Sequence, residues 1–123
     1  MKWHLPLLGL ALGVVGAGGP AMAAEPLPLR VLYVGNSRDR ATDHEAFLKQ
    51  YFDKVTVAPR KGFDPAAARD ADVVLLDWSQ SEGPVDKASS PFGKLEGWSK
   101  PTVLLGSAGL FMAGQWQLIG GAG

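Results

Sequence analysis

The sequence of 123 residues has no cysteine, only two histidines and no excess of either charge. Without cysteine, disulfides, thiol nucleophiles and thiolate metal ligands are excluded. His44 is the only histidine after residue 23, so a transition-metal site has little support. Twelve basic residues balance twelve acidic ones, which argues against non-specific binding of nucleic acid. We therefore expect no cofactor, no metal and no nucleic-acid partner.

The first 23 residues have the layout of a secretory signal peptide. Lys2 supplies a positive start, residues 5–15 are largely apolar, and residues 21–23 read Ala-Met-Ala. The apolar run is shorter than the roughly 20 residues that a membrane span requires. We expect cleavage after Ala23 or Ala24, export to the periplasm or the medium, and no stable membrane anchor afterwards.

Residues 24–123 are long enough for one small domain with a single hydrophobic core. Removal of residues 1–23 takes away Lys2 and no acid, so the formal net charge changes from 0 to −1. The sequence ends in Gly-Gly-Ala-Gly, with no further helix to cover a last strand. This ending gives the expectation that the sequence is a fragment.

Short apolar runs alternate with helix signals along this domain. Thr42 and Glu45 fit a capping box, with Thr42 as the N-cap of a helix whose apolar face continues to Phe52. Asp64 and Pro65 fit the start of a second, short helix. The predicted strands cover residues 29–34, 54–58, 72–78 and 102–105.

This alternation predicts a three-layer, flavodoxin-like α/β domain with a mainly parallel sheet of about four to five strands. The third strand is apolar without alternation, which is typical of a strand covered on both faces. Residues 79–100 form a long connection, predicted to be functional or mobile. Residues 110–113 fit one helical turn, and residues 115–119 fit a short edge strand.

Ligands of open α/β sheets bind beyond the carboxyl ends of the strands. Four segments should meet at that edge: residues 35–40, 58–61, 77–81 and 106–109. In the first, "VLYVGNS" resembles the block of SGNH hydrolases that delivers the nucleophilic serine, which would make Ser37 the nucleophile. The C-terminal Asp-x-x-His pair and the Gly-x-Asn-Asp block of that family are missing, so an ordinary strand-to-helix turn is the favoured interpretation.

Asp77 ends a strand, "DVVLLDW", that resembles the phosphorylated strand of response-regulator receivers. Receivers have an acidic pair after the first strand, where this chain has Gly35 and Asn36. We expect Asp77 to cap backbone amides or to face a pocket. The segment "VLLGSAGLF" resembles the nucleophile elbow of class I glutamine amidotransferase-like domains, with Ser107 in place of the cysteine and without its catalytic partners.

Across residues 30–109 the chain resembles exported ThuA-like domains of the class I glutamine amidotransferase-like fold. The resemblance rests on "VLYVGN", "DHEAFLKQYFDKVTV", "DADVVLLDW" and "KPTVLLGSAG". It implies a flavodoxin-like sheet and a carbohydrate-related activity or binding function. Two function classes stay open: an exported, non-catalytic or carbohydrate-related binding or accessory domain, and a small serine hydrolase using Ser37.

The sequence thus predicts a ligand pocket at the carboxyl edge of the sheet, for a small polar, anionic or sugar-like molecule. A helix N-terminus and two arginines would attract an anion, and the flat ring of a tryptophan could stack on a sugar. The candidate ligand-binding residues are Asn36, Ser37, Arg38, Arg40, Asp77, Trp78 and Ser107.

Overall fold

A computed structural model describes residues 24–82 and 89–118. Four strands are present in this part of the chain: β1 (Leu27–Val34), β2 (Phe52–Ala58), β3 (Val73–Trp78) and β4 (Thr102–Gly106). The helices are α2 (Arg38–Leu48) and α3 (Ala108–Gln115), and three single turns of 3₁₀ helix are η3 (Pro65–Ala68), η4 (Gln80–Glu82) and η5 (Leu95–Gly97). No helix within the described residues has the length and apolar character needed to cross a bilayer.

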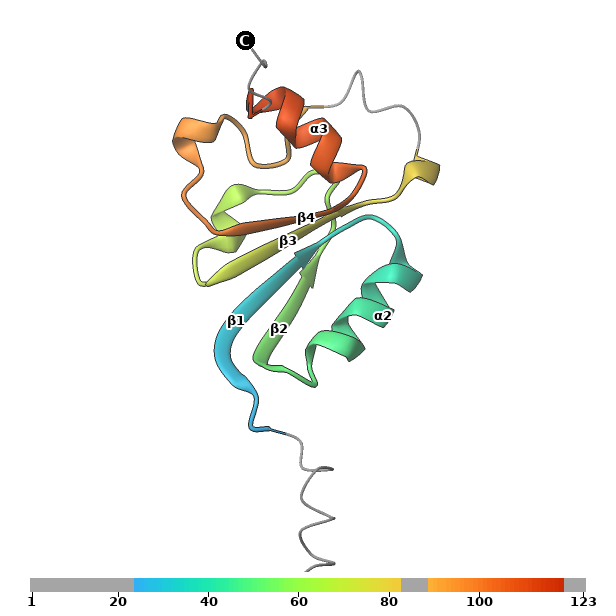
Figure 1. Ribbon diagram of the computed structural model, residues 1–123, viewed down its shortest axis with the longest axis vertical. Coiled ribbons are helices and arrows are strands. Elements are labelled where there is room, and N and C mark those ends of the chain that lie inside the picture. Colours follow the sequence, from blue (N-terminus) through green and yellow to red (C-terminus); the bar gives the residue numbers. More distant parts are fainter. Residues whose placement is uncertain (1–23, 83–88, 119–123) are drawn as a thin grey trace, which may run out of the picture.

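The four strands form one parallel sheet in the order β2-β1-β3-β4 (Figure 1). The chain therefore steps outward from β1 to β2, crosses back to β3 beside β1, and continues to β4. This order is the flavodoxin-like arrangement, and the predicted α/β class and parallel sheet are confirmed. All four strands end at the same edge of the sheet, where the loops after β1, β2, β3 and β4 gather.

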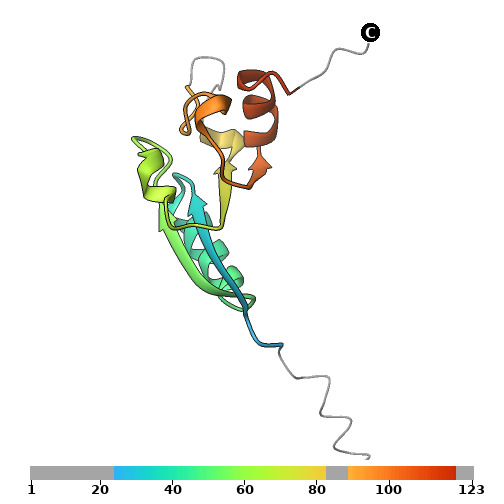
Figure 2. The same cartoon turned by 90° about the vertical axis from the view of Figure 1, so that its left-hand side faces the viewer.

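Side chains alternate along each strand, so both faces of the sheet carry apolar residues. Helices pack on both of these faces (Figure 2). On one face, Val31 and Val55 pack against Leu48 of α2. On the other face, Val34, Leu76 and their neighbours form a larger core. That core also includes residues of η3, of the connection after β3, and of α3: Ala68, Phe92, Trp98, Ala108, Phe111 and Met112.

The α2 face is only partly covered. Leu48 is buried, but Phe47 and Tyr51 are each about half exposed, so the predicted apolar face of the helix packs along one side only. Leu75 and Leu105 of β3 and β4 border an open apolar groove of about 420 Å³ beside α2. The continuous apolar sequence of β3 predicts that both faces of the strand are fully covered. The Leu75 side chain is instead only half-buried.

The start of α2 differs from the prediction. Ser37 is the N-cap, since its side chain accepts a hydrogen bond from the Arg40 amide at 3.4 Å. Thr42 lies inside the helix and donates its hydroxyl to the Arg38 carbonyl at 3.0 Å. The capping-box pattern was therefore misread, because a serine directly after the strand begins the helix one turn earlier. The Asp64 cap is confirmed: its carboxylate accepts the Ala66 amide at 2.9 Å.

The last described segment is a helix end and a turn where an edge strand was predicted. Helix α3 continues through Gln115, and Gln117 then adopts a left-handed backbone conformation with φ of 53°. The strand prediction for residues 115–118 is wrong, because the Trp116 ring is held back against the connection, with its Nε1 donating to the Gly93 carbonyl at 3.1 Å. Ile119 lies outside the described residues.

The described parts of the connection after β3 are well packed. Phe92 and Trp98 stack with 4.1 Å between ring centroids, and Phe63 meets Phe92 edge-on at 5.6 Å. The indole of Trp98 donates to the Thr102 hydroxyl at 2.7 Å, which joins the connection to the start of β4. Aromatic packing thus fixes these residues over the face that carries α3.

Gly106 makes the turn from β4 into α3 possible. Its φ is 63°, and a Cβ at this position would lie 2.6 Å from the Trp78 carbonyl oxygen. That oxygen accepts the Ser107 amide at 2.8 Å, so the turn closes tightly around the end of β3. Only glycine fits such a close approach with a positive φ.

We expect Gly106→Ala to lower the free energy of unfolding by about 2 kcal/mol or more, because strain and a backbone clash add. Gly109→Ala is the matched control, since no atom lies within 4 Å of its added Cβ and the site is helical. Urea unfolding of both variants measures the difference. Equal stability of the two variants would contradict this account of the turn.

Candidate functional site

The end of β3 divides the candidate site between the two faces of the sheet. Asp77 and Trp78 are consecutive, so their side chains point to opposite faces. Both are almost fully buried, at 1% and 3% exposed. Asp77 meets residues of α2, whereas Trp78 meets residues from the loop after β2 and from α3. Two separate polar clusters result.

The first is the buried aspartate cluster, formed by Tyr33, Arg40, His44 and Asp77. Arg40 donates Nε and Nη2 to the two Asp77 oxygens at 2.7 and 2.6 Å, and the Tyr33 hydroxyl donates to Asp77 at 2.5 Å. Burial alone would raise the pKa of Asp77, but the hydrogen bonds from Arg40 and Tyr33 outweigh it and hold that pKa below its usual value. Asp77 is therefore a charged partner of side chains, and the expected capping of backbone amides is not what holds it.

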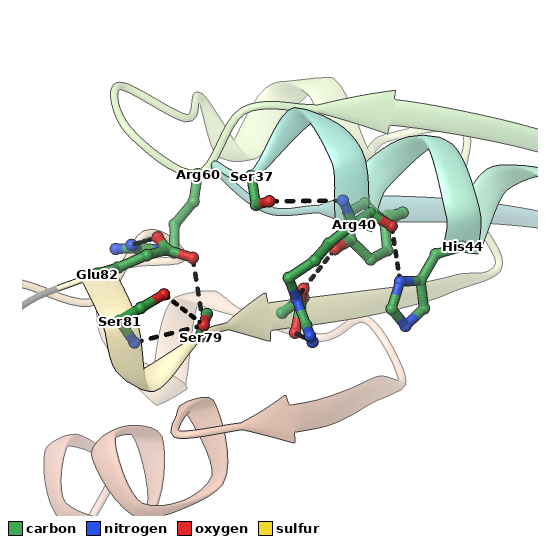
Figure 3. A network of polar contacts seen from close by, with 9 residues as sticks. Ser37, Arg40, His44, Arg60, Ser79, Ser81 and Glu82 are labelled. Carbon is green, nitrogen blue, oxygen red and sulfur yellow. Dashed lines mark hydrogen bonds and ion pairs between the residues drawn. The ribbon is translucent and has the colours of Figure 1, made fainter.

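His44 closes this cluster on the helix side. Its ring stacks on Tyr33 with 5.0 Å between centroids, and its Nδ1 lies 2.7 Å from the Arg40 carbonyl oxygen. Because that partner is a carbonyl, Nδ1 is the donor. Figure 3 shows His44 and Ser37 at different turns of α2, each bonded to a backbone atom of Arg40. Among the described hydrogen bonds, none joins Ser37 to a histidine.

The second cluster is the arginine pocket, a cavity of about 560 Å³ on the other face. The Arg60 guanidinium lies 3.5 Å from the centre of the Trp78 ring. Its Nη2 donates to the Glu82 carboxylate at 2.5 Å, and the second Glu82 oxygen accepts the Ser79 amide at 3.2 Å (Figure 3). The pocket is lined by Asn36, Arg60, Lys61, Gly62, Phe63, Trp78, Glu82, Ser89, Ser90 and Pro91.

Two residues that line this pocket each carry a buried donor with no acceptor among the described residues. The donors are Nε of Arg60 and Nε1 of Trp78. An unsatisfied buried donor costs about 1–3 kcal/mol, so such groups are uncommon in folded proteins. Both groups can only donate, so only an acceptor such as an oxygen atom could satisfy them.

The seven ligand-binding residues predicted from the sequence do not lie in one site. Asn36 and Trp78 line the arginine pocket, and the Asn36 side chain accepts the Lys61 amide at 2.8 Å. Arg40 and Asp77 neutralise each other on the opposite face. Ser37 caps α2, Arg38 is exposed on its first turn, and Ser107 starts α3 with its amide bonded to Trp78. The Trp78 ring contacts Arg60 and Phe111 and is 3% exposed, so it offers no free face for stacking on a sugar.

Arg60 and Glu82 were missed at the sequence level. Residues 58–61 had been placed at the carboxyl edge, so a signal for Arg60 existed: a cation two residues after the end of β2. Glu82 had no such signal. It reaches Arg60 because η4 turns the chain back directly after β3, within a connection that has no periodic pattern.

Comparisons with protein-family models, with curated proteins and with solved structures found no match. The resemblance to ThuA-like domains thus stays a prediction. Within residues 24–82 and 89–118, no three acidic or histidine side chains are grouped so as to hold a metal ion.

In the buried aspartate cluster, removal of Arg40 should lower the free energy of unfolding more than neutralisation of Asp77. Arg40→Met strands the buried Asp77 carboxylate and should cost about 2–4 kcal/mol at pH 7, somewhat less than for a fully buried pair because the Arg40 side chain is 43% exposed. Asp77→Asn leaves an arginine that still reaches water and should cost about 1–3 kcal/mol. Urea unfolding at pH 7 compares the two.

The pH dependence of the free energy of unfolding tests whether Asp77 is charged in the folded protein. In the wild type the Asp77 pKa is lowered by folding, so its contribution is present above about pH 4 and is lost as the pH falls. In Arg40→Met the folded pKa is raised instead, so the stability gap to wild type should narrow between about pH 6 and pH 3. A gap that stays constant over this range would contradict the assignment of Asp77 as a charged partner of Arg40.

Proposed function

We propose that the protein is an exported, non-catalytic binding domain that holds a small oxyanion, of the sugar-acid type, in the arginine pocket. The observation that carries the proposal is the pair of buried donors, Arg60 Nε and Trp78 Nε1, which have no acceptor among the described residues. Export rests on the signal-peptide pattern of residues 1–23, which lie outside the described residues. The carbohydrate-related role rests on the resemblance to ThuA-like domains.

The composition of the pocket supports a polar ligand of small size. A volume of about 560 Å³ lies within the range of small-molecule sites. Arg60 and Lys61 bring two positive charges, Glu82 brings one negative charge, and Asn36 and Ser90 add polar groups nearby. The position also suits a ligand, because the carboxyl edge of an open parallel sheet is where such folds bind their ligands.

The geometry around Ser37 favours binding over hydrolysis. A serine nucleophile needs a base within hydrogen-bond reach of its hydroxyl. Ser37 Oγ instead accepts an amide of its own helix, and the described contacts of His44 are to the Arg40 carbonyl and the Tyr33 ring. The serine-hydrolase alternative is therefore the weaker proposal.

Calorimetric titration with glucuronate and with inorganic phosphate tests the pocket. We expect Arg60→Gln to weaken the binding of an oxyanion at least tenfold, because a charge-assisted hydrogen bond contributes about 1.5–3 kcal/mol. Arg69→Gln is the matched control, since Arg69 is an exposed arginine after η3 and does not line the pocket. Equal binding by wild type and Arg60→Gln would place the site elsewhere.

A further inference from the structure

Among the described residues, three arginines pair with a carboxylate, and two of them do so in the same way. Arg40 presents Nε and Nη2 to the two oxygens of Asp77, at 2.7 and 2.6 Å. Arg30 presents the same two nitrogens to Asp72, at 3.1 and 3.0 Å. This parallel pair of bonds is the fork geometry that arginine and carboxylate form most readily.

Arg60 departs from this pattern. Its Nη2 bonds to Glu82 Oε2 at 2.5 Å, but its Nε has no acceptor in residues 24–82 and 89–118. The second Glu82 oxygen, Oε1, accepts the Ser79 amide at 3.2 Å instead of Arg60 Nε. Glu82 thus occupies half of the guanidinium edge. Both side chains are largely buried, at 12% and 15% exposed, so bulk water does not freely complete the other half.

We infer that the Glu82 carboxylate occupies the position on Arg60 where a ligand binds, and that the ligand carries a carboxylate which replaces Glu82 there. This inference rests on the proposed function, and it adds the class of the ligand and the residue that competes with it. A free carboxylate would bind both Nε and Nη2, as Asp77 does on Arg40. The entering group gains the bond that Glu82 leaves unmade, and Glu82 keeps its bond to the Ser79 amide.

A small carboxylic acid fits this site better than a neutral sugar. The position that Glu82 fills already accommodates a carboxylate beside Arg60. Lys61 lines the same pocket and offsets the charge that Glu82 would otherwise bring close to the ligand. The unpartnered donor Trp78 Nε1 calls for one more acceptor, which a hydroxyl or ring oxygen of a sugar acid supplies.

Glu82→Gln tests the inference, because it keeps the shape and the acceptor for Ser79 but removes the competing charge. With glucuronate as the probe, we expect calorimetric affinity to rise at least tenfold over wild type. Methyl glucoside, which lacks the carboxylate, should gain nothing. Glu96→Gln is the matched control: Glu96 is also in a single turn of 3₁₀ helix, but it is exposed and does not line the arginine pocket.

The outcomes separate this inference from the proposed function. If glucuronate binds wild type, Arg60→Gln abolishes binding and Glu82→Gln does not tighten it, the binding site stands and the role of Glu82 is wrong. Binding that appears only in Glu82→Gln supports the inference. If neither wild type nor Glu82→Gln binds glucuronate or phosphate, both proposals fail. Should Glu82→Gln unfold, Glu82→Asp, which draws the carboxylate back by one methylene, must tighten glucuronate binding instead.

Discussion

The buried carboxylate of Asp77 is the constraint on which the carboxyl edge of this sheet depends. A charge that is 1% exposed is tolerated only when donors surround it, and here Arg40 and Tyr33 supply them. Arg40 lies in the first turn of α2, so the ion pair fixes the start of that helix over β3. The Ser37 cap then leads directly from the end of β1 into the helix.

One residue later, the same strand serves the opposite face. Trp78 supports the Arg60 guanidinium at 3.5 Å, and Gly106 wraps the next strand end closely around the Trp78 backbone. The alternation of strand side chains therefore places Arg40 in an ion pair with Asp77 on one face of β3 and Arg60 beside a cavity on the other face. The first arginine has both edge nitrogens satisfied, and the second does not. This difference separates a structural cluster from a candidate binding site.

The fold was predictable because its signals are local and repeated. Four short apolar runs separated by helix caps and glycines specify parallel strands, and the Asp64-Pro65 pair specifies the short helix that follows β2. The helix start at Ser37 was missed because two plausible caps lie within one turn and a half. The strand predicted at residues 115–118 was wrong because tertiary packing of Trp116 overrode a weak alternation.

The candidate site was less predictable, for a geometric reason. Sequence reasoning placed the correct loops at one edge but could not assign their side chains to faces across strands. It therefore combined Arg40 and Asp77 with Asn36 and Trp78 in one pocket, although the sheet separates the two pairs. The pairing of Arg60 with Glu82 depends on the path of the connection after β3, for which the sequence has no periodic pattern.

The most direct test of this division is a ¹H–¹⁵N magnetic-resonance titration that observes the side-chain N–H groups during addition of glucuronate. The account predicts saturable shifts of the Arg60 Nε–H and Trp78 Nε1–H signals, because both donors lack acceptors in the described part of the chain and their residues line the arginine pocket. The Arg40 Nε–H signal should stay in place, because Asp77 already occupies it. A saturable shift at Arg40 with none at Arg60 or Trp78 would contradict the account.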